Sequence, residues 1–197
     1  MPYTLGGVTV EISGIPAPLA FVSPTQINFQ TPWDVQGFSH VPVIIINGTL
    51  VSATLVARVA DSAPALFSIN GSGSGQGAIA IAAPNAPLAA PIGAFANARP
   101  ARRGEFLQIY ATGLGPVRVT PLDGVATSTL STSRSPTVVI GGATASVTFA
   151  GLAPGIVGVY QINAQIPDAA ASGDAMPVSI SLSGATSNTV TVAIQLP

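Results

Sequence analysis

The chain has 197 residues, of which 48% are hydrophobic and 7% are charged, and its formal net charge is −1. This composition is too apolar for a disordered chain, and its 18 prolines make it too Pro-rich for a helical one. The lack of a basic excess argues against a nucleic-acid partner, and the absence of cysteine excludes disulfides and thiolate metal sites.

Short β-branched runs bounded by Gly, Pro, Asn and Ser fill the first part of the chain, and each predicts a strand. A Ser23-Pro24 turn separates two of these runs, and Asn47-Gly48 favours a hairpin between the last two. The expected strands are residues 8–12, 19–22, 26–30, 43–46 and 50–59. The pattern is typical of a β-sandwich.

The middle of the chain, residues 70–98, is predicted to be a Gly/Pro/Ala-rich connecting segment. Residues 71–77 superficially resemble a phosphate loop, but they lack the Gly-Lys-Ser/Thr ending and no helix follows, so a flexible linker is favoured. The apolar tract of residues 78–98 is interrupted by three prolines, and we therefore expect no membrane span. The first twenty residues show no cationic start before an apolar run, so no signal peptide is expected.

The last part of the chain repeats the first at a fixed offset of 135 residues. Gln26-Ile-Asn-Phe-Gln-Thr-Pro32 returns as Gln161-Ile-Asn-Ala-Gln-Ile-Pro167, and Ile45 matches Ile180. A fixed-period echo indicates one structural unit used twice. We therefore predict two units, residues 1–69 and 99–197, joined by residues 70–98. The expected strands of the second unit are residues 105–111, 137–140, 145–150, 160–166, 178–182 and 189–196.

Residues 105–116 of the second unit have no counterpart before Met1, so the first unit is predicted to lack its opening strand. We expect the resulting open edge beside residues 8–12, which include Val8 and Val10. Residues 77–82 alternate and are uncharged, and Ile79 and Ile81 could therefore be donated to that edge in another copy of the chain. Head-to-tail donation would produce a filament. The alternative is a fragment whose missing strand lies upstream.

Four segments carry a resemblance to a known family. They are residues 5–33, Ile109-Tyr-Ala-Thr-Gly-Leu-Gly-Pro116, Phe149-Ala-Gly-Leu-Ala-Pro-Gly155 and residues 160–167. Together they resemble the Solibacter-type uncharacterised C-terminal domain of large secreted or surface proteins of acidobacteria. That family is similar to immunoglobulin-like IPT/TIG modules. The resemblance implies an all-β fold of two tandem Ig-like sandwiches and an extracellular or cell-surface location, and it brings no known catalytic residue.

The most regular polar feature is a row of amides on each repeated strand. With a period of two, Gln26, Asn28 and Gln30 share one strand face, and Gln161, Asn163 and Gln165 share the matching one. These rows could bind sugar hydroxyls or pair with another chain, or they could simply be solvated. The residues expected in the core are Val10, Phe21, Ile27, Ile45, Ile109, Phe149, Ile162 and Ile180.

The remaining candidates have plainer interpretations. His40, the only histidine, is expected in a loop, and Trp33 is expected to cap the core, although with Tyr160 it could stack on a sugar. The candidate calcium ligands are Asp34, Asp168 and Asp174, interpreted as solvated turn residues. The candidate anion site is Arg99, Arg102 and Arg103, interpreted as ordinary partners of Glu105.

The sequence therefore predicts a non-catalytic extracellular structural or adhesion module without a cofactor. No nucleophile–base pair and no carboxylate pair stands out, so enzymatic activity is not expected. The first hypothesis is a self-assembling surface filament completed by strand donation, with another copy as partner. The alternative is a module of a larger secreted protein that binds a surface polysaccharide or matrix.

Overall fold

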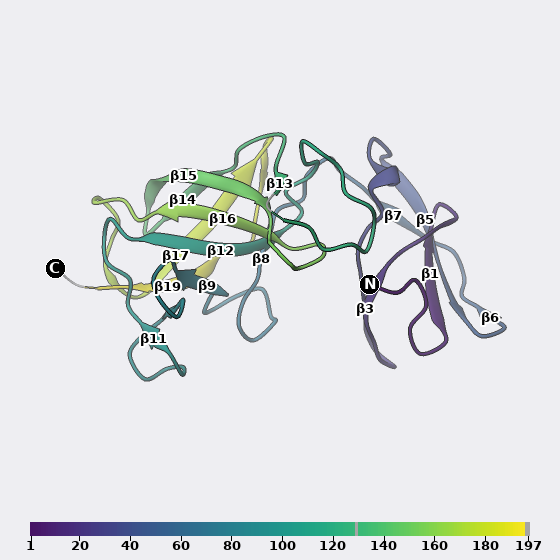
Figure 1. Cartoon of the computed structure of the whole chain (residues 1–197), viewed down its shortest axis with the longest axis horizontal. Helices are drawn as coiled ribbons and strands as arrows, with labels where there is room; N and C mark the ends of the chain where they lie inside the picture. Colours follow the sequence, from purple (N-terminus) through teal and green to yellow (C-terminus); the bar gives the residue numbers. More distant parts are fainter. Residues whose placement is uncertain (129, 196–197) are drawn as a thin grey trace.

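The computed structural model describes residues 1–128 and 130–195, which are almost entirely β-strands and loops, and the all-β prediction is confirmed (Figure 1). The first lobe contains β1 (Val8–Ile12), β2 (Ile15–Pro16), β3 (Leu19–Val22), β4 (Ile27–Phe29), the 3-10 turn η1 (Trp33–Val35), β5 (His40–Asn47), β6 (Leu50–Val51) and β7 (Leu55–Arg58). The second contains β8 (Ala65–Leu66), β9 (Ile79–Ile81), β10 (Leu88–Ala89), β11 (Ala98–Arg99), β12 (Phe106–Thr112), β13 (Leu130–Ser131), β14 (Thr137–Ile140), β15 (Ala143–Leu152), β16 (Tyr160–Gln165), β17 (Gly173–Leu182), β18 (Ala185–Thr186) and β19 (Val190–Ile194). Residue 196, expected at the end of the last strand, lies outside the described residues.

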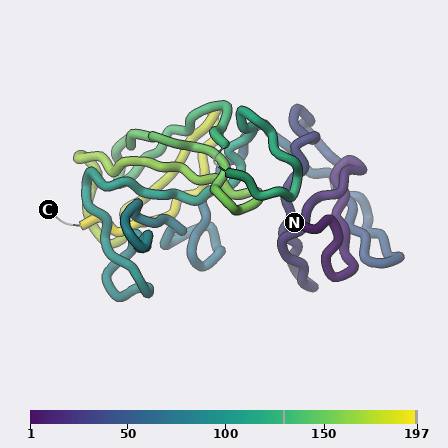
Figure 2. Tube along the Cα trace, viewed as in Figure 1, coloured from purple at the N-terminus to yellow at the C-terminus, as the bar shows by residue number. Residues whose placement is uncertain are grey.

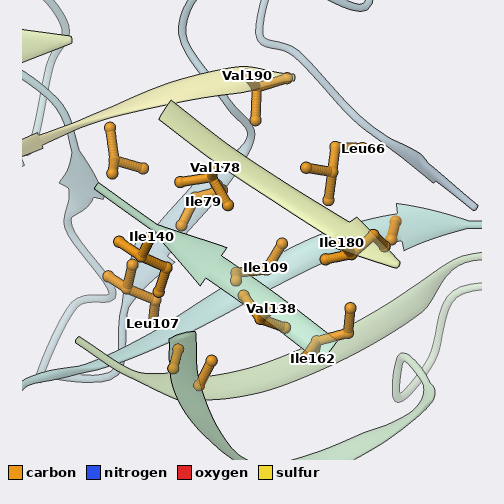
Figure 3. Close-up of a cluster of buried hydrophobic side chains, with 14 of the residues drawn as sticks. Leu66, Ile79, Leu107, Ile109, Val138, Ile140, Ile162, Val178, Ile180 and Val190 are labelled. Atoms are coloured by element: carbon orange, nitrogen blue, oxygen red, sulfur yellow. The ribbon is translucent and has the colours of Figure 1, made fainter. Parts of the chain in front are cut away.

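The second lobe buries its core between two layers of strands. In one layer β12 lies between β9 and β16, and β16 also pairs with β15. In the other layer β14 lies between β15 and β17, and β17 carries β18 and β19. Strand β15 takes part in both layers, because its start pairs with β14 and its remainder with β16. Ile109, Ile162 and Ile180 are fully buried in the resulting cluster (Figure 3).

The first lobe is smaller and its second layer is a single hairpin. Strands β2, β1 and β5 form one sheet, with β6 and β7 both on β5. Strands β3 and β4 form a separate two-stranded sheet. The core between them is limited to Val10, Ile12, Ala17, Leu19, Val35 and Val41. The core predictions for Phe21 and Ile45 are wrong, since both are exposed. Ile27 and Phe149, also expected in the core, are only half-buried.

The sequence repeat is reproduced by the strand pairing. At the offset of 135 residues, β4, β5, β6 and β7 correspond to β16, β17, β18 and β19. Val43 lies opposite Leu55 in the first lobe, just as Val178 lies opposite Val190 in the second. Even a side-chain hydrogen bond repeats, because Ser52 Oγ accepts from Ile45 N at 3.0 Å and Ser187 Oγ accepts from Ile180 N at 3.0 Å.

A second offset, of 128 residues, relates the strands that come before β4. The β1–β2 hairpin corresponds to β14 and the start of β15, with Ile12 opposite Ile15 and Ile140 opposite Ala143. Strand β3 corresponds to the end of β15, and both have a bulge before a phenylalanine that lies opposite an asparagine, Phe21 or Phe149. The two offsets differ because the loop before β16 is longer than the loop before β4.

The segment expected to be a linker is part of the second lobe instead. Residues 70–98 contribute β9 and β10, and Ile79 lies opposite Ile109 of β12. The glycine-rich loop is tied to this lobe, since Ser68 Oγ accepts from Gly73 N at 2.9 Å and Asn188 Nδ2 donates to Gly73 O at 2.6 Å. Small residues allow segments of the chain to pack closely here. A Cβ on Gly77, for example, would lie only 2.8 Å from the side chains of Ile79 and Val190.

The two lobes meet at the loop between β12 and β13. Asp123 Oδ1 accepts a hydrogen bond from Trp33 N at 3.1 Å, and Gln30 Oε1 accepts one from Gly124 N at 2.7 Å. Trp33 also packs against the core of the second lobe. Figure 2 shows that the N-terminus lies beside this junction, while the last described residues lie at the end of the second lobe that is farther from the first.

Candidate functional site

The two lobes are the two units of the repeat, and the feature that distinguishes them is the outer edge of β4. Its counterpart β16 pairs with β15 on one side and with β12 on the other. Strand β4 pairs with β3, and within residues 1–128 and 130–195 no strand lies on its other edge. The first unit therefore has no equivalent of β12. We call the unpaired side of β4, together with the apolar side chains beside it, the β4 edge.

The open edge is not where the sequence placed it. The chain turns back after β1, so that Glu11 and Ile12 pair with Pro16 and Ile15 of β2. Val10 O also accepts a hydrogen bond from Ala17 N at 2.8 Å. The edge beside residues 8–12 is therefore covered by the chain itself, and the expectation of an open edge there is wrong. Val8 and Val10 are both buried, and Val10 belongs to the core of the first unit.

Ile45 and Leu55, two inward-facing residues of the sheet opposite the β3–β4 hairpin, are left uncovered. Val43 and Ile45 lie opposite Ile12 and Val10, which are buried, and Leu55 lies opposite Val43. Because directly opposed residues share one face of a sheet, all of these side chains face the core side. The repeat allows the exposure of matched residues to be compared. Ile45 is 38% exposed and its match Ile180 is 1% exposed, while Leu55 is 68% exposed and its match Val190 is 0% exposed.

In the second unit these positions are covered by β12 and its neighbours. Figure 3 shows Leu107 and Ile109 of β12 among the side chains of the opposite layer, including Val138 and Ile180. Leu66 of β8 and Ile79 of β9 belong to the same buried cluster. Burying apolar surface is favourable by roughly 25 cal/mol per Å². The first unit therefore lacks a stabilising contribution that the second unit has.

The surroundings of the β4 edge are uncharged. No Asp, Glu, Lys or Arg occurs in residues 19–32 or in residues 41–57, which supply the hairpin and most of the facing strands. Glu11 of β1 and Arg58 of β7 lie on the other face of their sheet, by the alternation of the strands. Ile27 is half-buried, while Phe29 at the end of β4 is exposed. An apolar, uncharged surface with an unpaired strand beside it is suited to another polypeptide strand, because main-chain hydrogen bonds and side-chain burial are then both satisfied.

The predicted donor of such a strand is already in use. Ile79 and Ile81 pair with Ile109 and Leu107 of the same chain, and both are 1% exposed. Donating residues 77–82 to another copy would remove these side chains from the core of the second unit. The prediction that this segment is a free donor is therefore wrong. Its alternation indicated a strand correctly, but the partner strand is β12.

The amide rows lie on the outer side of their strands. Gln26 Nε2 donates to Asn28 Oδ1 at 2.7 Å, and Gln161 Nε2 donates to Asn163 Oδ1 at 2.8 Å. Gln26 and Asn28 are exposed, whereas the second row is half-buried beside β12. The third member differs: Gln30 accepts from Gly124 N at the junction, and Gln165 Nε2 donates to Gly104 O at 2.9 Å.

The charged candidates are separate structural groups. Arg99 forms two hydrogen bonds of 2.8 and 2.9 Å with Glu105, which hold the pKa of this carboxyl below its usual range. Arg102 Nε instead donates to Gln195 Oε1, and Arg103 donates to Ala170 O. Within the described part of the chain, no group of three or more His, Cys, Asp or Glu side chains could hold a metal ion.

The aromatic and histidine candidates also lie apart from each other. Trp33 is at the junction of the two units, while Tyr160 is buried in the second unit, where its hydroxyl donates to Gly115 O. Burial raises the pKa of Tyr160 to about 12. His40 is exposed at the start of β5, with Nδ1 3.1 Å from Ser39 Oγ.

Comparison with known proteins adds no function to this geometry. No family model, no curated protein and no solved structure matches the chain. None of the helical segments in the described residues is long and apolar enough to cross a membrane. A functional interpretation therefore depends on the internal comparison between the two units.

Proposed function

We propose that this chain is a non-catalytic structural or adhesion module that joins another polypeptide through the β4 edge. The observation that carries the proposal is the difference in burial between residues that the repeat makes equivalent. Ile45 and Leu55 face inward and are exposed, while Ile180 and Val190 are buried in one cluster with side chains of β8, β9 and β12. A strand placed on β4 would occupy the place that β12 has in the second unit.

An extracellular or cell-surface location is part of this proposal. It is supported by the resemblance of the chain to a domain of secreted and surface proteins, and by the Ig-like tandem that this resemblance implies. A low content of charge also leaves little repulsion between neighbouring copies, which suits a protein that works in contact with others.

A selection from a library of random seven-residue peptides tests whether the β4 edge binds polypeptide. The wild-type chain should enrich uncharged peptides with apolar residues at alternate positions, and a Leu55→Thr variant should not. Ile92→Thr is the matched control, because Ile92 is 82% exposed in the second unit, far along the sequence from β4. Enrichment that is equal on wild-type and Leu55→Thr chains, or no enrichment at all, would contradict the proposal.

Binding of a surface polysaccharide or matrix is the second candidate, and it is favoured by the outer face of the same hairpin. Phe21 is exposed and lies opposite Asn28, whose amide shares that face with Gln26. An exposed aromatic ring beside amides is suited to stacking on a sugar and to hydrogen bonding with its hydroxyls. Retention on insoluble polysaccharide that is lost in Phe21→Ala and kept in Leu55→Thr would support this function.

A further inference from the structure

We propose that the β4 edge accepts an uncharged strand of another polypeptide, antiparallel to β4, with a small residue opposite Phe29 and a large apolar residue opposite Ile27. This inference rests on the proposed function, and it specifies which polypeptide the edge selects. The partner is defined here by the chemistry of its side chains at each position of the strand.

The direction and register follow from the complete unit. Strand β12 runs antiparallel to β16, with Leu107 opposite Ala164, Gln108 opposite Asn163 and Ile109 opposite Ile162. The offset of 135 residues carries these three positions of β16 onto Phe29, Asn28 and Ile27 of β4. An accepted strand in the same register presents its residues to β4 in the same order as Leu107, Gln108 and Ile109.

The position opposite Phe29 selects for small size. In the second unit, Leu107 and Ala164 lie opposite each other, and both are 0% exposed, so a large and a small side chain share this space. In the first unit the small partner is replaced by Phe29, which is 39% exposed. A leucine opposite Phe29 would overfill the layer, because packed interiors tolerate extra methylene groups poorly. Alanine, serine or glycine is expected there instead.

The position opposite Ile27 selects for a large apolar side chain. Ile109 fills this place in the second unit, opposite Ile162 and in one cluster with Ile180 and Val190. The first unit keeps the same kinds of residue around the matching space, namely Ile27, Ile45 and Leu55. The volume available is therefore similar, and isoleucine remains suitable.

The strand must be uncharged, because a charge on its inner face would be buried without a partner. On its outer face, the residue at the place of Gln108 lies opposite Asn28, beside the exposed amide of Gln26. A polar uncharged residue can exchange hydrogen bonds with these amides. Within the part of the second unit that the structure describes, the strand of this kind, β12, is not free, since it is already paired with β9 and β16.

Fluorescence anisotropy with synthetic peptides tests the size pattern. The parent peptide has the sequence of residues 106–112, with both ends blocked, and two others carry Leu107→Ala or Ile109→Ser. The Leu107→Ala peptide should bind the whole chain at least about threefold more tightly than the parent, and the Ile109→Ser peptide at least about tenfold more weakly than the Leu107→Ala peptide. Binding should protect the amides of β4 from hydrogen exchange.

A Phe29→Ala variant provides the reciprocal test. It restores the small residue found at the matching position in the second unit, so the parent peptide should now bind more tightly than the Leu107→Ala peptide. Equal affinities of these two peptides for both proteins would overturn the inference but leave the proposed function in place, provided that β4 is protected. Failure of every peptide to bind would overturn both.

Sedimentation velocity of the chain alone tests whether a second copy of the chain, and not a different polypeptide, occupies the β4 edge. We expect a monomer over the concentration range of the peptide experiment. Self-association that disappears in Leu55→Thr and persists in Ile92→Thr would identify a second copy as the occupant, and it would overturn the assignment to a different polypeptide.

Discussion

Ile45 and Ile180 are matched residues of one repeated strand, and they differ chiefly in what covers them. Truncation of a fully buried isoleucine costs about 2–5 kcal/mol, because the transfer free energy is lost and a cavity remains. We therefore expect Ile180→Ala to lower the free energy of unfolding of its unit by this amount. Ile45→Ala should cost less than about 1 kcal/mol, since its side chain is already partly hydrated. Urea denaturation followed by hydrogen exchange in each unit measures both. Equal losses would show that Ile45 is covered in solution.

Asp123 gives the junction between the units a dependence on pH. Burial raises the pKa of this carboxyl, although the hydrogen bond from Trp33 N opposes the rise. A carboxyl whose pKa is higher in the folded state favours folding when protonated, so its contribution falls as the pH rises from the unfolded pKa through the folded one. Asp123→Asn keeps an acceptor for Trp33 N and removes the charge of this partly buried group.

We therefore expect Asp123→Asn to be more stable than the wild type near pH 7, with the difference shrinking as the pH falls below the folded pKa. Thermal unfolding across this range measures the effect. Asp61, which is exposed, supplies the control substitution Asp61→Asn. A stability difference that grows at low pH would contradict the assignment of burial as the cause.

At the scale of elements, one asparagine ties β8 and the glycine-rich loop to the second unit. Asn188 Oδ1 accepts from Leu66 N at 2.7 Å, and its Nδ2 donates to the carbonyl oxygens of Leu66 and Gly73 at 2.9 and 2.6 Å. Leaving such partly buried groups without partners costs about 1–3 kcal/mol. Asn188→Ala should therefore destabilise the second unit by this amount and speed hydrogen exchange at Leu66.

The matched control for this prediction is Asn97→Gly, because the φ of Asn97 is 52°, where alanine would add backbone strain. Asn97 is exposed, and its side chain donates a single hydrogen bond, to Asn85 O at 2.8 Å. Its loss should change stability by less than about 0.5 kcal/mol, as is usual at the surface. Similar effects of the two substitutions, or unchanged exchange at Leu66 in Asn188→Ala, would contradict the role given to Asn188.

The repeat was predictable from sequence only in part. Residues 26–58 match the second unit at one offset with identical motifs, so their strands were found. The earlier strands also carry a signal, since Thr9-Val-Glu-Ile-Ser-Gly14 matches Thr137-Val-Val-Ile-Gly-Gly142. The change of offset hides this match. Without the match, β1 could not be aligned with β14, which lies inside the sheet of the second unit. The open edge was consequently assigned to the wrong strand.

The connecting segment could not be interpreted correctly from its composition. Glycine, alanine and proline are typical of linkers, yet they are also used where backbones approach closely. A Cβ on Gly113, for example, would lie 1.9 Å from Ala63 O, where the chain enters the second unit. Only the tertiary pairing of β9 with β12 shows that residues 70–98 belong to a packed unit.

For the whole molecule, strand β4 connects the open edge with the junction between the two units. Gln30 follows β4 directly, and its Oε1 accepts from Gly124 N, a buried group of the second unit. Trp33 lies three residues further and packs on the second core. A strand accepted antiparallel to β4 would therefore begin beside this junction. The rigidity of the joint and the geometry of the binding edge thus depend on the same short segment.

Gln30→Ala should accordingly loosen the two units without unfolding either. The substitution leaves Gly124 N without its acceptor, and an unsatisfied buried donor costs about 1–3 kcal/mol, which here acts on the contact between the units. We expect a broader distribution of distances between probes on the two units, measured by electron paramagnetic resonance, and weaker binding of peptides at the β4 edge. Gln165→Ala is the matched control, because Gln165 occupies the same repeat position but donates to Gly104 within its own unit. An unchanged distribution in Gln30→Ala would show that the other contacts at the junction hold the joint, namely Trp33, its hydrogen bond to Asp123, and the hydrogen bonds from Met1 N to Gly124 O and from Tyr3 OH to Asp123 O.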